Sequence, residues 1–244
     1  MKSTYESRPR AAFAVGIVGA LVIGNILSNR VVPAAFYVPT NLLVTATVVL
    51  LARFEVGARD VGLTQWRRGA VWGGTVVAAG VALYLTASLL PPTRGLFDDS
   101  RVDGDLGRML YEVFIRIPSG TVILEETAFR GVLPAVLARH MSTVRAVVVS
   151  SLLFGFWHVL PSLSLSEVNP VLGDILGEGL AAKIGGVVFA VVGTFLVGLW
   201  LSFLRHRSGS LLAPVLVHTA SNSVAYAMAW FIGGAGIQGS IGRL

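Results

Sequence analysis

Residues 181–204 read AAKIGGVVFAVVGTFLVGLWLSFL, and Lys183 is their one charged side chain. A helix needs about 20 predominantly apolar residues to cross the hydrocarbon core of a bilayer, and this stretch is long enough. Backbone N–H and C=O groups find no water in that core, so a single segment must satisfy them internally as an α-helix. The stretch therefore predicts a membrane-spanning helix.

Similar apolar stretches recur along the chain. We predict seven spans, at Ala11–Ser28, Ala34–Ala52, Gly69–Leu90, Ser119–Arg139, Thr143–Leu160, Ala181–Leu204 and Ser210–Ile232. The composition also indicates a membrane protein, because 54% of the 244 residues are hydrophobic and 13% are charged, whereas soluble domains carry about 25% charged residues. We interpret residues 1–244 as a single integral-membrane domain.

An additional helix is expected before the fourth span. Leu106–Ile117 places its apolar residues at helical spacing, which is typical of an amphipathic helix lying in the membrane interface. Pro118 and Gly120 are then expected to bend the chain into the fourth span. The predicted fold is an all-α polytopic membrane bundle of about seven transmembrane helices plus this interfacial helix.

The distribution of basic residues predicts an orientation and argues against a nucleic-acid partner. The formal charge is +6 and the pI about 10.3, but Lys and Arg lie at the ends of apolar runs and not in a basic patch with interleaved aromatic residues. Placing the N-terminus inside puts most of them, including Lys2, Arg8 and Arg10, on the inner side. The same three residues could begin a signal peptide. The first apolar run is long for one and has no Ala-x-Ala site, so an uncleaved anchor is the preferred interpretation.

Three short polar clusters interrupt the apolar spans, at residues 125–130 (EETAFR), 154–158 (FGFWH) and 218–222 (HTASN). Ionisable groups within a membrane are costly, and they mark functional sites by default. The chain contains no cysteine, so thiolate nucleophiles and disulfides are excluded. The candidate chemistry therefore rests on carboxylates, imidazoles and an amide.

The two adjacent glutamates differ in their helical neighbours. Glu126 and Arg130 are four residues apart, so their side chains can meet on one helix face as a structural ion pair. Glu125 points about 100° away from Glu126 around the helix and has no basic residue one turn away. It is either a general base or a neutral acid that is hydrogen-bonded to the backbone.

The histidines are ambiguous one at a time. His158 near the end of a span is either an interfacial hydrogen-bonding group or a functional one, whereas His218 and Asn222 share one face of the last span. A helix rises about 1.5 Å per residue. Measured on this scale from the inner end of each helix, Glu125 and His158 lie roughly 20 Å deep, His218 roughly 12 Å deep and Asn222 roughly 18 Å deep. These overlapping depths predict one shared site.

The ordered set Glu-Glu-x-x-x-Arg, Phe-x-x-x-His and His-x-x-x-Asn resembles the CPBP family of intramembrane proteases. This is also called the Abi or CAAX-protease family, and it includes the type II CAAX prenyl endopeptidases. The resemblance implies a catalytic core within residues 119–229. It also implies that Glu125 activates water, that His158 holds this water, and that His218 and Asn222 donate to the oxyanion of the tetrahedral intermediate.

The resemblance makes Glu126 and Arg130 a supporting ion pair. The implied function is an intramembrane endopeptidase that hydrolyses a peptide bond near the membrane with glutamate-activated water. Its substrate would be a membrane-associated peptide or protein, either in CAAX-type or in bacterial peptide processing. The brevity of the chain favours a prokaryotic cell membrane as its location.

Two alternatives stay open at this point. Glu125, His158 and His218 could bind zinc as a set of two histidines and one glutamate. A His-Glu-x-x-His motif is absent, and a metal-free glutamate mechanism is slightly preferred.

The second alternative is a non-catalytic transporter, channel or scaffold that uses buried His and Glu as a proton or ion site. Asn222 argues against it, because a proton relay gains little from an amide whereas an oxyanion site uses one.

Overall fold

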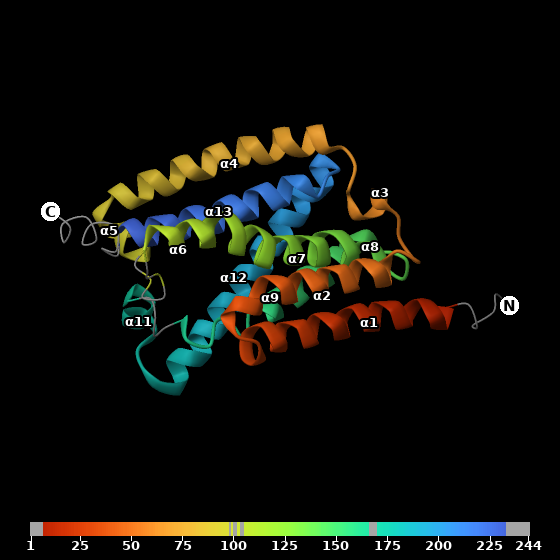
Figure 1. Ribbon diagram of the computed structural model, residues 1–244, viewed down its shortest axis with the longest axis horizontal. Coiled ribbons are helices and arrows are strands. Elements are labelled where there is room, and N and C mark those ends of the chain that lie inside the picture. The colour runs from red at the N-terminus through yellow and green to blue at the C-terminus, as the bar shows by residue number, and fades with distance from the viewer. Residues whose placement is uncertain (1–6, 98, 100–101, 103–104, 166–169, 233–244) are drawn as a thin grey trace.

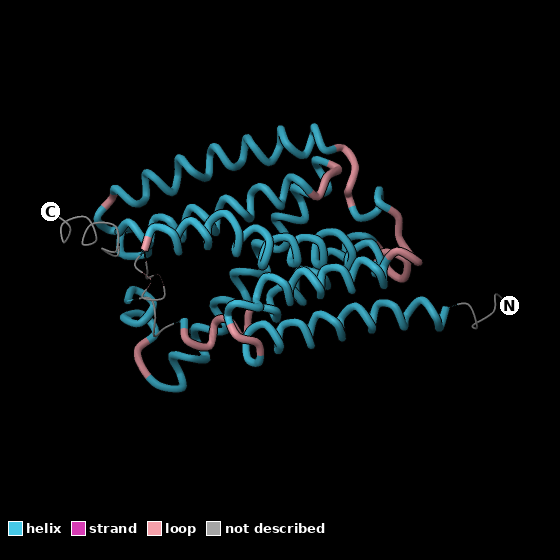
Figure 2. Tube along the Cα trace, in the orientation of Figure 1, coloured by secondary structure: helices cyan, strands magenta, loops and turns pink. Residues whose placement is uncertain are grey.

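The computed structural model describes residues 7–97, 99, 102, 105–165 and 170–232. Lys2 and residues 233–244, on which part of the orientation prediction rests, lie outside these residues. The described residues form helices and connecting loops, with no strand among them (Figure 2). The longer helices are α1 (Ser7–Ile26), α2 (Tyr37–Ala52), α4 (Trp66–Leu89), α9 (Thr143–Trp157), α12 (Gly179–Ser208) and α13 (Leu212–Ile232).

Short helical segments connect or extend these helices. They are η1 (Leu27–Val31), η2 (Ala34–Phe36), α3 (Ala58–Val61), α5 (Pro91–Arg94), η3 (Gly95–Phe97) and α11 (Pro170–Leu176). A further long helix is built from five consecutive segments, α6 (Leu106–Tyr111), η4 (Glu112–Val122), α7 (Ile123–Glu126), η5 (Thr127–Val132) and α8 (Leu133–Leu137).

The predicted all-α membrane bundle is confirmed. Among the described residues, five helical stretches are long and apolar enough to cross a membrane, namely Ala12–Val31, Ala34–Ala52, Ala58–Leu89, Gly179–Ser208 and Leu212–Ile232. Of the two other predicted spans, one corresponds to α9, which is apolar but only 15 residues long. The other lies in the long helix from α6 to α8. The number of seven spans therefore stays a prediction.

The helix predicted over Leu106–Ile117 is present, and its place in the membrane interface stays a prediction, whereas the chain continues as a helix through Pro118, where a bend was predicted. The chain runs from Leu106 to Leu137 as one continuous helix (Figure 1). Pro118 lies inside its π-helical segment η4. Proline disrupts an α-helix because its ring meets the carbonyl four residues earlier, and the wider π-helical turn, which pairs residues five apart, relieves this conflict. Gly120 serves close packing: Asn41 Nδ2 donates to its carbonyl at 2.6 Å, and a Cβ there would lie 3.1 Å from the Tyr37 ring.

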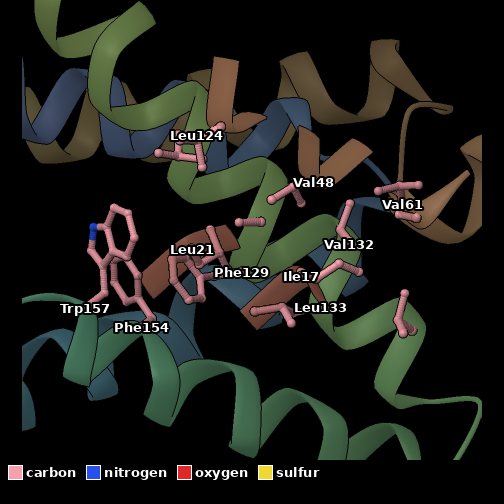
Figure 3. Packing of buried hydrophobic residues seen from close by; sticks show 14 of the residues in the cluster. Ile17, Leu21, Val48, Val61, Leu124, Phe129, Val132, Leu133, Phe154 and Trp157 are labelled. Carbon is pink, nitrogen blue, oxygen red and sulfur yellow. The ribbon is translucent and has the colours of Figure 1, made fainter. Parts of the chain in front are cut away.

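The helices pack so that the long helix from α6 to α8 lies inside the bundle. In Figure 1, α1, α2, the long helix, α13 and α4 run along the long axis of the molecule, and α12 crosses them obliquely. Helix α13 packs against α4, α12 against α9, and α1 against α2. Figure 3 shows the main hydrophobic core, to which α1, α2, the long helix and α9 all contribute. Phe129 in this core packs the long helix against α9, because its ring centroid lies 5.3 Å from that of Phe154 and 5.7 Å from that of Trp157.

Candidate active site

The buried carboxylate of Glu126 connects the long helix to α13. Its side chain is fully buried, and its Oε1 lies 2.9 Å from Arg130 Nη1, as the four-residue spacing predicts. The same oxygen lies 2.7 Å from Nδ1 of His218, which is 7% exposed. The ion pair is therefore part of a chain Arg130–Glu126–His218. The contact with His218 was not predictable from the sequence, because helical spacing carries no information about contacts between helices.

Hydrogen-bond partners fix the orientation of both histidine rings. A carboxylate paired with arginine only accepts hydrogen bonds, so the Nδ1–H of His218 donates to Glu126. Nδ1 of His158 lies 2.8 Å from the carbonyl of Phe154, which likewise only accepts. In the neutral form of each ring, the proton is therefore on Nδ1 and Nε2 carries the free lone pair.

Glu125 faces His218 from the other side of the ring. It is 5% exposed, and its Oε1 accepts a 2.9 Å hydrogen bond from Nε1 of Trp157. Its Oε2 has no hydrogen-bond partner among the described residues and lies 3.7 Å from His218 Nε2, which is too far for a direct hydrogen bond. The site thus presents an unpaired carboxylate oxygen beside an imidazole nitrogen, where a small polar molecule can bridge the two.

Phe154 connects His158 to the other polar groups. Its ring centroid lies 4.6 Å from that of His158 and 6.2 Å from that of His218, edge to face in both cases. The Arg130 guanidinium carbon is 3.8 Å from the same centroid, within the range of a cation–π contact. Phe154 therefore sets the spacing between the two imidazoles from one fixed position in the core.

Two cavities meet at His158. A cavity of ≈ 710 Å³ lies between α4, α9, α12 and α13. Its wall includes Val76, Val77, Val81, Tyr84, His158, Trp200, Leu201, Val217, His218, Ser221 and Asn222. A smaller cavity of ≈ 200 Å³ is lined by Ser28, Asn29, Tyr37, Asn41, Arg116, Thr121, Glu125, Trp157, His158 and Pro161. The first wall is mainly apolar, and the second is rich in hydroxyl, amide and charged groups.

The structure thus brings some predicted site residues into direct contact and places others nearby. Glu125, Glu126 and Arg130 form one contact group with His218. His158 lies on the wall of both cavities. Asn222 shares the larger cavity with both histidines, but its only described hydrogen bond is with Ser221, at 3.4 Å.

Comparison with known families finds a match over the part of the chain that carries this site. Residues 109–224 match the family model described as Type II CAAX prenyl endopeptidase Rce1-like. This stretch is similar to the Rce1-like family. The match covers slightly less than half of the chain and contains all six predicted site residues. It confirms the resemblance found in the sequence, and it supports a membrane protease. No curated protein and no solved structure matches the chain.

The histidines and glutamate of the Rce1-like region do not fit the zinc site considered from the sequence. Glu125 and His218 face each other, whereas His158 meets Glu125 only across the small cavity and His218 only across the large one. Within the described ranges, no three His, Cys, Asp or Glu side chains are grouped so that they could hold a metal ion. The three residues therefore do not form a zinc ligand set here.

Trp157 was not singled out by the sequence analysis, although it precedes His158. A buried indole N–H normally has an acceptor, and here the acceptor is Glu125. We expect Trp157→Phe to destabilise the protein by about 1.5–3 kcal/mol, because it removes a hydrogen bond to a charged group. Thermal unfolding of the purified protein in detergent micelles measures this loss.

Trp200→Phe is the matched control for this substitution. Trp200 also lines a cavity of the Rce1-like region, and no hydrogen bond of its indole to Glu125 is present. Its replacement removes the same atoms without removing that bond. Equal melting temperatures for the two variants would show that the Trp157–Glu125 bond contributes nothing to stability.

Proposed function

We propose that the protein is an intramembrane endopeptidase that hydrolyses a peptide bond near the membrane with water activated by Glu125. One observation carries the proposal: the unpaired Oε2 of the buried Glu125 lies 3.7 Å from His218 Nε2. A general base must reach the proton that it removes, directly or through one water. A water beside this gap would contact both groups at hydrogen-bonding distance.

In this mechanism, Glu125 removes a proton from water and His158 holds the water in place. His158 suits this role because its Nδ1–H is bound to the Phe154 carbonyl, which leaves Nε2 as an acceptor. Trp157 keeps the other Glu125 oxygen occupied, so the proton is directed to Oε2. The resulting hydroxide attacks the scissile carbonyl, and Glu125 then returns the proton to the leaving amine.

The negative charge that develops on the scissile carbonyl oxygen needs hydrogen-bond donors on the side of the site opposite the attacking water. His218 can donate only through Nε2–H, because its Nδ1–H is bound to Glu126. It must therefore be doubly protonated when it acts, and the Glu126 carboxylate stabilises this imidazolium. Asn222, one helical turn away on the same cavity, supplies a second donor that stays neutral at every pH.

The two cavities suit separate routes for water and substrate. The polar cavity beside Glu125 would supply water, and the larger, mainly apolar one would hold the peptide. Apolar walls between membrane helices favour a substrate that is itself membrane-associated. The family name points to a CAAX-type substrate; processing of a bacterial peptide or protein uses the same chemistry. The predicted orientation, with the N-terminus inside a prokaryotic cell membrane, stays part of this proposal.

Asn222→Ala tests the proposed oxyanion site. We expect kcat to fall about 10²–10³-fold, the usual effect of removing one oxyanion donor, while KM changes little, because the interaction forms only in the transition state. The assay uses the full-length protein in proteoliposomes with membrane-anchored reporter peptides, one prenylated and one unmodified. Thr194→Ala, on the same cavity wall but bonded to the Ala190 carbonyl, is the control and should retain activity. Cleavage of neither reporter by the parent protein would contradict the proposed function, and unchanged kcat in Asn222→Ala would remove Asn222 from the mechanism.

A further inference from the structure

A separate cavity of ≈ 270 Å³ opens at one end of the bundle, where α8 turns into α9 and α12 turns into α13. This end lies near the first described residues of α1 (Figure 1). Ionisable side chains on its wall are those of Asp60, Arg130, Arg139, Arg205 and His206. Three guanidinium groups and one imidazole thus surround a space with a single carboxylate on its wall.

The charges around this cavity do not balance. Asp60 Oδ2 pairs with Arg139 Nη2 at 3.1 Å, and Arg130 pairs with Glu126. Arg205 has no carboxylate partner in the described part of the chain. Its Nη2 donates to the carbonyl of Asp60 at 2.9 Å, and its Nε is 3.4 Å from that of Val61. A guanidinium that is 7% exposed is therefore solvated by neutral carbonyls alone, whereas buried charges are ordinarily paired with an opposite charge.

The local backbone fixes this guanidinium in position. Gly62 has a φ of +86°, and a Cβ at this position would lie 2.1 Å from Arg205 Nε. The Gly62 carbonyl also accepts a 2.8 Å bond from the Leu211 N–H, which ties the loop before α4 to the start of α13. The loop thus leaves room for Arg205 and for no side chain of its own. Arg205 is held in a defined place at the cavity wall.

Two further features make the cavity suitable for an anion. Arg130 is 2% exposed, and its Nη2 has no hydrogen-bond partner within the described residues. Helix α9 begins at Thr143 on the cavity wall, so the partial positive charge of a helix N-terminus faces the same space. Arg130, the N-terminal end of α9 and the uncompensated guanidinium of Arg205 therefore all border this cavity.

We propose that this cavity binds a phosphate group, with Arg205 and Arg139 as its main ligands. Guanidinium groups match phosphate oxygens in a planar, two-pronged geometry. Basic pockets between membrane helices at the cytoplasmic side bind lipid head groups, and the predicted orientation puts this end of the bundle on that side. The phosphate belongs to an anionic lipid head group or to a free phosphate ion. This site is independent of the proposed protease function.

Binding to the purified full-length protein in neutral detergent tests the proposal. Isothermal titration compares inorganic phosphate with a short-chain phosphatidylglycerol, at constant ionic strength because salt screens such contacts. We expect saturable binding, and Arg205→Gln and Arg139→Gln should each raise the dissociation constant about tenfold or more. Asp60→Asn should lower it, because it removes the carboxylate that competes for Arg139. Tighter binding of the lipid identifies a head group as the ligand, and equal or tighter binding of inorganic phosphate identifies the free ion.

Arg67→Gln is the matched control. It removes an equal charge from an exposed residue near the start of α4 that does not line this cavity, and it should leave binding unchanged. Arg139→Gln keeps the test valid if Arg205→Gln fails to fold, since the Arg139–Asp60 pair is about half exposed and such pairs add little stability. The proposal is overturned if neither probe saturates, or if the Arg139 variant binds as the Arg67 variant does.

Discussion

Replacing Glu125 with glutamine should lower the rate of peptide cleavage roughly 10²–10⁴-fold, the usual contribution of a general base. Glutamine has nearly the same shape, and its amide oxygen can still accept the hydrogen bond from Trp157 Nε1. It cannot take up a proton from water. The variant should therefore fold as the parent does, with a similar melting temperature. Single-turnover cleavage of a membrane-anchored reporter in proteoliposomes measures the loss.

Glu112→Gln is the control for this experiment. Glu112 is also a buried glutamate of the long helix, but its partner is Arg116, at 3.0 Å, and it lines neither of the two cavities that meet at His158. We expect it to retain the parent's rate. If Glu125→Gln cleaves as fast as Glu112→Gln, Glu125 is not the base, and the proposed mechanism is wrong.

Replacing Glu126 with alanine should cost stability as well as activity. The substitution leaves Arg130 charged and buried without its partner, and breaking a buried ion pair in this way typically costs about 3–5 kcal/mol. It also removes the acceptor that orients His218. Reversible unfolding in mixed detergent micelles measures the change in the free energy of unfolding. Cleavage normalised to the folded fraction measures the loss of His218 positioning.

The double variant Glu126→Ala, Arg130→Met separates these two effects. Without the arginine, no uncompensated charge is buried, so part of the lost stability should return. Activity should stay low, because His218 still lacks its acceptor. Recovery of full activity together with stability would mean that Glu126 serves only to neutralise Arg130, as the sequence alone suggested.

Local features of the chain were predictable because they depend on neighbours within one helix. The helical class follows from apolar stretches that must satisfy their backbone hydrogen bonds internally. The Glu126–Arg130 pair follows from four-residue spacing, which brings two side chains together in any helix. The ordered motifs indicated the family, and the match over residues 109–224 agrees. The bend at Pro118 failed as a prediction because a π-helical turn accommodates the proline, and this turn forms where the long helix packs against α2.

Contacts between helices could be decided only by the tertiary structure. The sequence alone predicted that Glu125, His158, His218 and Asn222 lie at overlapping depths on three apolar helices. It could not determine the rotation of each helix about its axis. Packing of α9 and α13 against the long helix fixes that rotation, and with it the placing of His218 between two carboxylates and the bond from Trp157 to Glu125. The same packing separates His158 from the Glu125–His218 contact, because rigid helices in a packed core leave each side chain few directions to point.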